Sequence, residues 1–205
     1  EDPEPEFVDF NGKDEIALTL QENNHIVIID GKTAAVVANF SAGTVTTKDV
    51  DTKKDGAYDF TGGKADLPRE PDAIQWLDDD RFVIANEGDW NGGTRSFSIL
   101  NRAGEVLFDS AAQLEHNAAQ LGHYPDKRNK KGVEPEGLEV ATFGDSNYIF
   151  VTEERSSLIA VYKDTGADPE FVQGLPSGIS PEGLVAIPGR NLLATANETD
   201  LREAG

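Results

Sequence analysis

The 205-residue sequence contains no cysteine and no methionine. Without cysteine no disulfide can stabilise the fold, and thiolate catalysis and Cys-ligated metal sites are excluded. Because methionine is missing even at position 1, we expect the chain to be a processed product or an excised segment. The fold must therefore depend on its hydrophobic core and its hydrogen bonds.

Basic residues are also scarce, because 18 Lys and Arg stand against 38 Asp and Glu, for a formal net charge of −20. Nucleic acids and anionic membrane surfaces are bound through basic patches, so neither is expected as a partner. No apolar run approaches the roughly 18 residues of a membrane span, and no membrane insertion is expected. The acidic composition suits a protein that handles cations, in an extracellular, periplasmic or cell-surface location.

What the sequence does contain is short apolar runs between turn signals. It has 20 glycines and 10 prolines with 38% hydrophobic residues, which is typical of a turn-rich β protein. Asn11-Gly12 and Asp30-Gly31 are hairpin signals that separate four such runs within residues 5–40. Four strands in about 40 residues is the size of one blade of a β-propeller.

This pattern recurs along the chain and predicts an all-β fold, a partial β-propeller of about three and a half four-stranded blades in one domain, residues 1–205. The unpaired edges of such an arc invite a second chain that completes the propeller, although a self-sufficient small β domain is an alternative. A short helix is expected in the second insertion, from a Ser110–Gln113 capping box to Gly122. The expected blades are 5–40, 70–109, 133–174 and 180–205, and the insertions are 41–69 and 110–131.

A proline followed by an acidic residue opens each expected blade, and a second acidic residue follows where the second strand ends. The two acids of each pair are 15 to 18 residues apart. In a blade, the start of the first strand and the end of the second share one face, so we expect these carboxylates to gather near the ring axis. The pairs are Glu6 with Glu22, Asp72 with Glu87, Glu136 with Glu154, and Glu182 with Glu198.

Gathered carboxylates need a positive partner, because two of them about 5 Å apart repel by roughly 3 kcal/mol at an effective dielectric constant of about 20. Ca²⁺, which takes six to eight oxygen ligands, is the simplest partner, and Asn86 and Asn197 could add amide oxygens. Alternatively, each acid only accepts backbone hydrogen bonds or caps a turn. The predicted metal-binding residues are Asp72, Glu87, Asp89, Glu134, Glu136, Glu154, Glu182 and Glu198.

Other motifs are ambiguous in the sequence. Residues 49–56 resemble an irregular calcium loop, but they also suit a solvated turn. His116 and His123 could share one face of the predicted helix, although surface positions are the simpler reading. Trp90, which follows two acids in Glu87-Gly88-Asp89-Trp90, suits either a binding rim or a buried core position.

Two basic features lie near the acids. The cluster Lys127–Lys131 is either a solvated loop or a phosphate site. Arg155 is better placed to hold a phosphate, and it could equally be a counter-ion for the acidic residues. No serine-hydrolase elbow, zinc-protease motif or phosphate-cradling loop is present.

Several motifs together resemble the choice-of-anchor I family, whose members are secreted or surface-attached bacterial β-propellers related in pattern to phytase-like esterases. Members are longer than this chain, so the resemblance implies one half of such a propeller. Residues 51–57 also look like the family's loop between the first two blades. The other motifs are Leu20-Gln21-Glu22-Asn23-Asn24, Pro71-Asp72-Ala73-Ile74, Ala85-Asn86-Glu87-Gly88-Asp89, Glu134-Pro135-Glu136-Gly137 and Ser180-Pro181-Glu182-Gly183-Leu184.

Some members of that family carry the name of atypical alkaline phosphatase, which implies a metal-dependent phosphoester hydrolase. In that reading Ca²⁺ binds the phosphate and activates a water, Arg155 neutralises charge on the phosphate, and Glu153 is the general base. The alternative is a non-catalytic propeller with a structural metal and a rim that binds a cell-surface ligand. In a third reading the propeller is only a scaffold.

Overall fold

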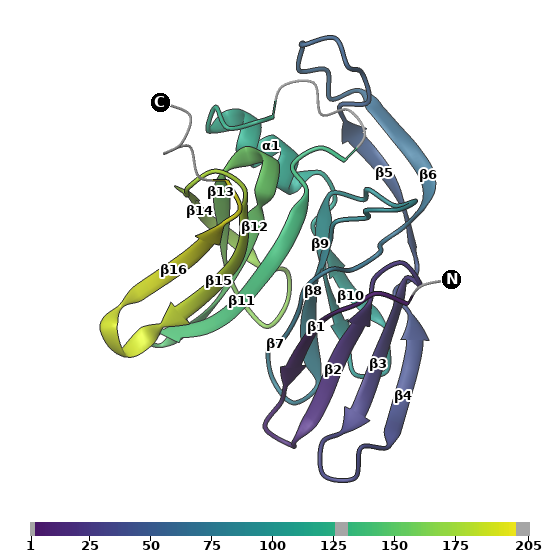
Figure 1. Cartoon of the computed structure of the whole chain (residues 1–205). Coiled ribbons are helices and arrows are strands. Elements are labelled where there is room, and N and C mark those ends of the chain that lie inside the picture. The colour runs from purple at the N-terminus through teal and green to yellow at the C-terminus, as the bar shows by residue number, and fades with distance from the viewer. Residues whose placement is uncertain (1–2, 126–130, 200–205) are drawn as a thin grey trace.

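The computed structural model of the chain describes residues 3–125 and 131–199, and within these ranges it is an all-β structure with one α-helix. Its strands form three four-stranded and two two-stranded antiparallel sheets (Figure 1). In the first sheet each strand pairs with the next one along the chain. Its strands are β1 (Pro5–Phe10), β2 (Glu15–Leu20), β3 (His25–Asp30) and β4 (Val36–Ser41).

The same meander is repeated in the second and third sheets, and a two-stranded hairpin follows. The second sheet contains β7 (Ile74–Trp76), β8 (Arg81–Asn86), β9 (Ser96–Asn101) and β10 (Val106–Asp109). The third contains β11 (Pro135–Phe143), β12 (Ser146–Glu153), β13 (Leu158–Lys163) and β14 (Glu170–Pro176). The final hairpin is β15 (Pro181–Ile187) and β16 (Leu192–Asn197), and the short 3₁₀ turns are η1 (Glu154–Ser156) and η2 (Pro188–Arg190).

Successive sheets pack face to face, and the first strand of each lies innermost. β1 contacts β7, β7 and β8 contact β11, and β11 contacts β15. Apolar clusters fill the spaces between neighbouring sheets, around Ile28 and Phe82, around Phe97 and Tyr162, and around Phe150. The described sheets form an open arc and do not close into a ring, which confirms the predicted all-β partial propeller.

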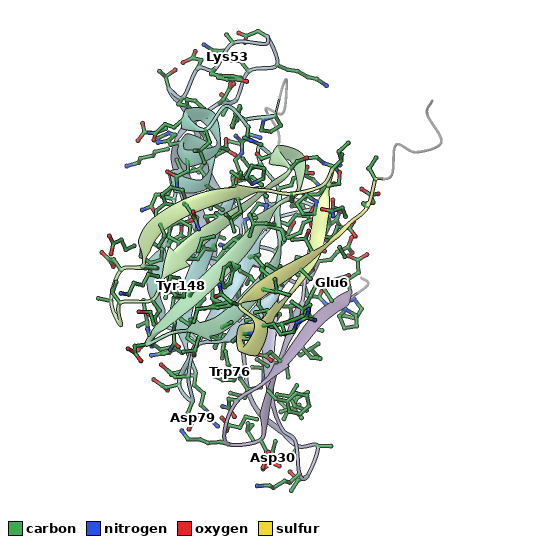
Figure 2. The ribbon with its side chains drawn as sticks, turned by 90° about the vertical axis from the view of Figure 1, so that its left-hand side faces the viewer. Glu6, Asp30, Lys53, Trp76, Asp79 and Tyr148 are labelled. Carbon is green, nitrogen blue, oxygen red and sulfur yellow. The ribbon has the colours of Figure 1, made fainter. Side chains whose placement is uncertain are left out.

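The first insertion contains a hairpin that the sequence did not predict. Its strands are β5 (Thr44–Val50) and β6 (Gly62–Pro68), and it rises at the top of Figure 1. Most of its side chains are exposed, so the apolar alternation that marks the blade strands is missing. Figure 2 shows Lys53 at the tip of this hairpin, while the turns at Asp30 and Asp79 lie at the opposite end of the molecule.

The second insertion holds the helix α1 (Gln113–Gln120). The predicted capping box is wrong, because the Ser110 hydroxyl accepts a hydrogen bond from the Phe97 N–H instead, and no side chain within residues 3–125 and 131–199 caps the helix. Gly122 does lie just beyond the helix, with φ = +76°, and its N–H donates to the Ala119 carbonyl. No helix in the described ranges is both long and apolar enough to span a membrane.

The two insertions pack against each other through aromatic rings. Tyr58 and Phe60, which precede β6, lie with ring centroids 5.2 and 5.1 Å from that of Tyr124. The Phe60 ring also meets His116 of α1, at 5.0 Å. Edge-to-face contacts of this kind stabilise by more than the area that they bury. The hairpin and the helix therefore form one structural unit beside the blades.

Glu115 of α1 connects this unit to the chain that leads into β11. Its side chain is fully buried and accepts hydrogen bonds from Arg95, from the Tyr124 hydroxyl at 2.6 Å and from the Val133 N–H at 3.0 Å. Arg95, which is 2% exposed, also donates to the Asp51 carbonyl at 2.8 Å. Removal of any one partner would leave a buried charge without full compensation.

Gly132 is expected to be indispensable for this arrangement. It has φ = +59°, and a Cβ there would lie 1.8 Å from Glu115 Oε1. We expect Gly132→Ala to lower the free energy of unfolding by about 2–4 kcal/mol, because the buried carboxylate must move. Gly144 has φ = +61° and no neighbour within 4 Å, so Gly144→Ala should cost only about 1 kcal/mol, for its backbone conformation alone. Chemical denaturation measures both, and equal losses would contradict the role of Glu115.

Candidate functional site

The same backbone turn opens all four blades. The residue before each opening proline has a positive φ, at 40°, 44°, 51° and 55° for Glu4, Glu70, Glu134 and Ser180. This conformation is costly for residues other than glycine, by about 1–3 kcal/mol each, and is typical of ligand clamps and active sites. In three blades the carbonyl of this residue accepts the N–H of the residue that follows the second strand. Those residues are Gln21, Glu154 and Glu198, with N–O distances of 2.9, 2.9 and 2.8 Å.

This turn directs the acid after each proline toward one cavity of about 510 Å³. The four blade-opening acids come from four different sheets or the loops that precede them. They line the cavity together with Glu87 at the end of β8. In the first blade Gln21, rather than the expected Glu22, faces the cavity, because the register pairs Pro5 with Leu20. The lining residues are Glu6, Phe7, Gln21, Asp72, Glu87, Glu136, Glu182, Gly183 and Ala196.

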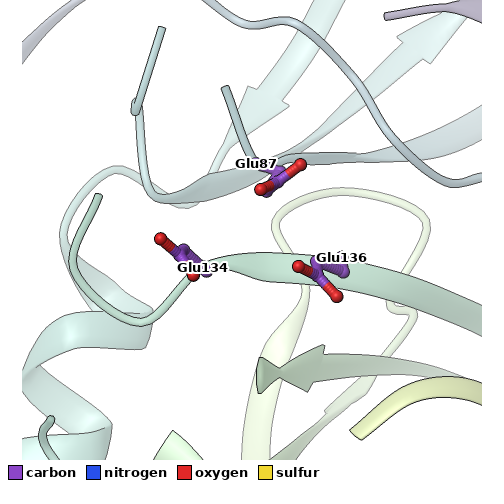
Figure 3. Close-up of side chains that lie close together, drawn as sticks. All are labelled: Glu87, Glu134 and Glu136. Carbon is purple, nitrogen blue, oxygen red and sulfur yellow. The ribbon is translucent and has the colours of Figure 1, made fainter. Parts of the chain in front are cut away.

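The closest group of acids lies at one side of this cavity. One carboxylate oxygen from each of Glu87, Glu134 and Glu136 lies within 4.8 Å of the other two (Figure 3). Glu154 extends the group, since its carboxyl faces that of Glu136 at hydrogen-bond distance. We call Glu87, Glu134, Glu136 and Glu154 the acidic cluster. Two carboxyls can face each other in this way only with a shared proton or a cation between them.

Two basic side chains partly neutralise the acidic cluster. Arg155 forms ion pairs with Glu134 and Glu154, whose side chains are each 1% exposed. Lys131 pairs with Glu87 at 3.3 Å and also with Asp89, whose side chain is 55% exposed. Glu87 additionally accepts a hydrogen bond of 2.7 Å from the Gln21 amide. Among the residues that the structure describes, two bases face the four acids of the cluster, which gives an excess of negative charge.

Two carboxylate oxygens of the site are buried without a donor. Asp72 Oδ1 and Glu154 Oε2 receive no hydrogen bond from an N–H or hydroxyl group of the described residues. Glu154 as a whole is only 2% exposed. An unpaired buried carboxylate is strongly unfavourable, so each oxygen calls for a proton or a cation.

Burial and mutual repulsion shift the protonation of these acids. Burial, followed by the nearby charges of Glu87, Glu6 and Glu182, raises the pKa of Asp72 to about 8. Burial likewise raises the pKa of Glu87. The pKa values of Glu136 and Glu154 are also raised, first by burial and, for Glu136, next by the Glu154 charge. The site therefore holds protons more strongly than ordinary carboxylates when no cation is present.

The remaining predicted site residues lie elsewhere. Glu198 is exposed, and only its backbone N–H takes part in the blade-opening turn. Asp89 lies at the edge of the site, paired with Lys131. Glu153 is fully buried near Glu115 and Ser156, and it is not among the residues that line the cavity. Burial raises the pKa of Glu153 well above its usual value.

Comparison with known proteins identifies the family. The profile of the choice-of-anchor I domain matches residues 1–92 and 90–167. The chain belongs to the choice-of-anchor I family. Choice-of-anchor domains are associated with attachment to the cell surface, which supports an extracellular or cell-surface location in general. A comparison with curated proteins finds no match.

Solved structures show the fold of this choice-of-anchor I chain. Virginiamycin B lyase from Staphylococcus aureus, in its selenomethionine form, has a TM-score of 0.57 and 10% identity, over 96% of this chain and 50% of the lyase. A streptogramin B lyase has a TM-score of 0.56 and 11% identity, over 96% of this chain and 49% of that protein. At such low identity the likeness shows the propeller fold alone. The chain spans about half the length of these structures.

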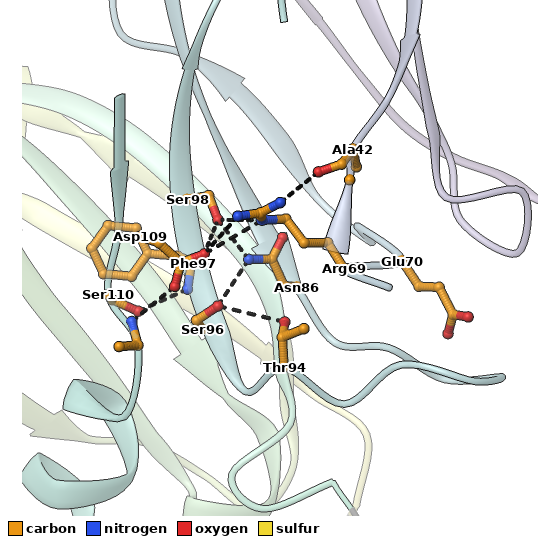
Figure 4. A network of polar contacts seen from close by, with 12 residues as sticks. Ala42, Arg69, Glu70, Asn86, Thr94, Ser96, Phe97, Ser98, Asp109 and Ser110 are labelled. Atoms are coloured by element: carbon orange, nitrogen blue, oxygen red, sulfur yellow. Dashed lines mark hydrogen bonds and ion pairs between the residues drawn. The ribbon is translucent and has the colours of Figure 1, made fainter. Parts of the chain in front are cut away.

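Neither asparagine expected as an extra ligand lines the cavity of the choice-of-anchor I chain, although the buried Asn86 Oδ1 receives no hydrogen bond from the described residues. The Asn86 amide donates to Ser96 and Ser98, at 3.0 and 2.8 Å, within a buried network around Arg69 (Figure 4). Arg69 also pairs with Asp109 and donates to the Ala42 carbonyl, which joins the first two blades (Figure 4). Asn197 is exposed at the end of β16.

The other ambiguous motifs have structural roles. Asp51 and Asp55 each accept a hydrogen bond from the backbone N–H two residues ahead, and Asp51 is buried whereas Asp55 is exposed. His116 and His123 bond to separate backbone carbonyls, those of Asp49 and Ser156. Residues 127–130 of the basic cluster lie outside the described residues.

Trp90 is 47% exposed, so it belongs to the rim and not to the core. Its loop is held by Glu70, a residue that the sequence analysis did not single out. The Glu70 carboxylate accepts the backbone N–H groups of Trp90, Asn91 and Gly92, each at 2.9 Å. The signal was present in the sequence, because Glu70 stands directly before Pro71, as Glu134 stands before Pro135.

Proposed function

We propose that this protein is a calcium-binding propeller of the cell surface, with its ion held by the acidic cluster. The observation that carries the proposal is the buried Glu154 Oε2, which receives no hydrogen bond from an N–H or hydroxyl group of the described residues and lies in a carboxyl group that faces Glu136. One carboxylate oxygen each of Glu87 and Glu134 lies within 4.8 Å of an oxygen of Glu136. A cation placed among these groups would neutralise their excess charge and satisfy the unpaired oxygen.

The donor set favours Ca²⁺ over other metals. All candidate ligands are carboxylate oxygens, which suit hard cations, and the described residues of the cluster contribute no imidazole. Ca²⁺ binds oxygens at 2.3–2.6 Å, so its opposite ligands are up to about 5 Å apart. The 4.8 Å spacing of Glu87, Glu134 and Glu136 fits this limit, whereas Mg²⁺ demands a tighter octahedron.

Isothermal titration tests the proposal. We expect Ca²⁺ to bind with a Kd of about 10⁻⁴–10⁻³ M, the range of extracellular calcium modules. The double variant Glu136→Gln with Glu154→Gln should abolish the binding heat, since it removes two negative charges from the cluster. Glu198→Gln is the matched control, because Glu198 was predicted from the sequence but is exposed and outside the cavity. Loss of binding in the control, or unchanged binding in the double variant, would refute the assignment.

Phosphoester hydrolysis is a second candidate function at the same site. It is favoured by the size of the cavity, about 510 Å³, which leaves room for a phosphate beside a bound ion. Glu153 does not line the cavity but Asp72 does, so Asp72 is the better placed carboxylate to accept a proton from a metal-activated water. Hydrolysis of p-nitrophenyl phosphate that requires Ca²⁺ and stops with EDTA would support this activity. Absence of EDTA-sensitive turnover in a protein that binds Ca²⁺ would leave a non-catalytic propeller.

A further inference from the structure

Arg155 and Lys131, the two described bases of the site, differ in where the carboxylates that they pair with lie. Both carboxylates that it pairs with, Glu134 and Glu154, belong to the acidic cluster, and both are buried. The Arg155 side chain itself is 40% exposed. Lys131, by contrast, pairs with Asp89 outside the cluster and keeps this partner if Glu87 turns to an ion.

A bound Ca²⁺ would compete directly with Arg155. The guanidinium bonds Glu134 Oε2 and Glu154 Oε1, and calcium takes carboxylate oxygens in single or bidentate fashion. A divalent ion in the cluster would also repel the guanidinium at close range. Only the side chain needs to move, because the Arg155 N–H is fixed to the Val133 carbonyl at 3.1 Å.

We propose that Arg155 is a counter-ion that Ca²⁺ displaces, and that the released guanidinium then binds an oxyanion, a phosphate or carboxylate group of a ligand. This inference rests on the proposed calcium binding. The guanidinium presents planar paired donors that match such anions. Calcium, with six to eight coordination positions, keeps room for an oxygen of the same anion. The cavity thus changes from a site that repels anions to one that binds them.

Titration with methylphosphonate, a phosphate analogue that is not hydrolysed at phosphorus, tests the coupling in the full chain. Its affinity should be at least about fivefold higher in saturating Ca²⁺ than in EDTA, and it should raise the Ca²⁺ affinity by the same factor, because coupling is reciprocal. Titration with acetate distinguishes carboxylate ligands from phosphate ligands. Equal methylphosphonate affinity with and without bound Ca²⁺ would overturn the inference.

Substitution of Arg155 gives effects of opposite sign on the two ligands. Arg155→Gln should weaken methylphosphonate binding while it strengthens Ca²⁺ binding, by roughly tenfold, since a competing charge is removed. Arg155→Lys keeps the charge but loses the paired donors, so only methylphosphonate binding should weaken. This variant takes the place of Arg155→Gln as the test if Arg155→Gln does not fold. Arg190→Gln is the matched control, because exposed Arg190 lies at the far end of β15 from the cavity.

The outcomes separate the two proposals. If the unaltered chain binds no Ca²⁺, the proposed function fails. If it binds Ca²⁺ but Arg155→Gln weakens that binding, Arg155 supports the ion site and is not displaced from it. If Arg155→Gln leaves methylphosphonate binding unchanged, the anion binds to the metal alone. The last two results overturn the inference and leave calcium binding intact.

Discussion

Ca²⁺ at about 10–100 mM, which is 100 times the expected Kd, should raise the melting temperature at pH 8 by about 5–10 °C and have little effect at pH 5. At an ion concentration of 100 times Kd, binding adds about 2.7 kcal/mol to the free energy of unfolding. For a domain of this size, 1 kcal/mol corresponds to roughly 2–4 °C. The pH dependence arises because protons compete with the ion: the pKa of Asp72 is raised to about 8, and those of Glu87, Glu136 and Glu154 are also raised.

Without Ca²⁺ the free energy of unfolding is expected to fall as the pH rises. A carboxyl whose pKa is raised in the folded state binds more protons there than when unfolded, so its contribution to stability is present at low pH. For Asp72 this contribution is lost as the pH rises from about 4 toward 8. Melting curves in EDTA across this range should therefore show stability falling with pH, and Ca²⁺ should cancel the fall. A calcium effect equal at pH 5 and pH 8 would contradict binding by these carboxylates.

Arg95→Ala is expected to lower the free energy of unfolding by about 3–5 kcal/mol, the usual cost of removing one partner of a buried ion pair. Arg95 and Glu115 are 2% and 0% exposed, so the substitution leaves the Glu115 carboxylate buried beside a cavity. The loss should loosen α1, the Asp51 loop and the entry to β11 together, because Arg95 and Glu115 bond to all three.

Arg102→Ala is the control for this prediction. Arg102 pairs with Glu15, but its side chain is 37% exposed, and ion pairs of this type contribute at most about 1 kcal/mol. Urea denaturation with CD detection measures both variants. If Arg95→Ala costs no more than Arg102→Ala, the buried pair does not hold the insertions to the blades.

Part of the site could be predicted from the sequence because a propeller repeats its geometry. Once the blades are aligned, the acids after Pro71, Pro135 and Pro181 must share a face, whatever their exact distances. The register within a blade could not be predicted in the same way. Pro5 pairs with Leu20, so the residue that follows the second strand and lines the cavity is Gln21 and not Glu22, and the apolar pattern does not fix the end of a strand to within one residue.

The sequence also could not predict which of two adjacent side chains faces the site. Glu153 and Glu154 are neighbours at the end of β12, yet one is buried in the core beside Glu115 and the other faces Glu136. Successive residues of a strand point to opposite faces, so a choice between them needs the register. The β5–β6 hairpin was missed for a related reason, because its exposed strands have no apolar alternation to reveal them.

The sequence by itself determined that the chain is an acidic, repeated β structure without disulfides, and it determined which carboxylates open its blades. Local alternation and turn residues carry that information. Only the tertiary structure decided which carboxylate oxygens lie close together, which of them receive no hydrogen bond from the described residues, and which arginine forms ion pairs with them. Those properties depend on the packing of one sheet against the next, and burial in that packing is what shifts the pKa values of the acids.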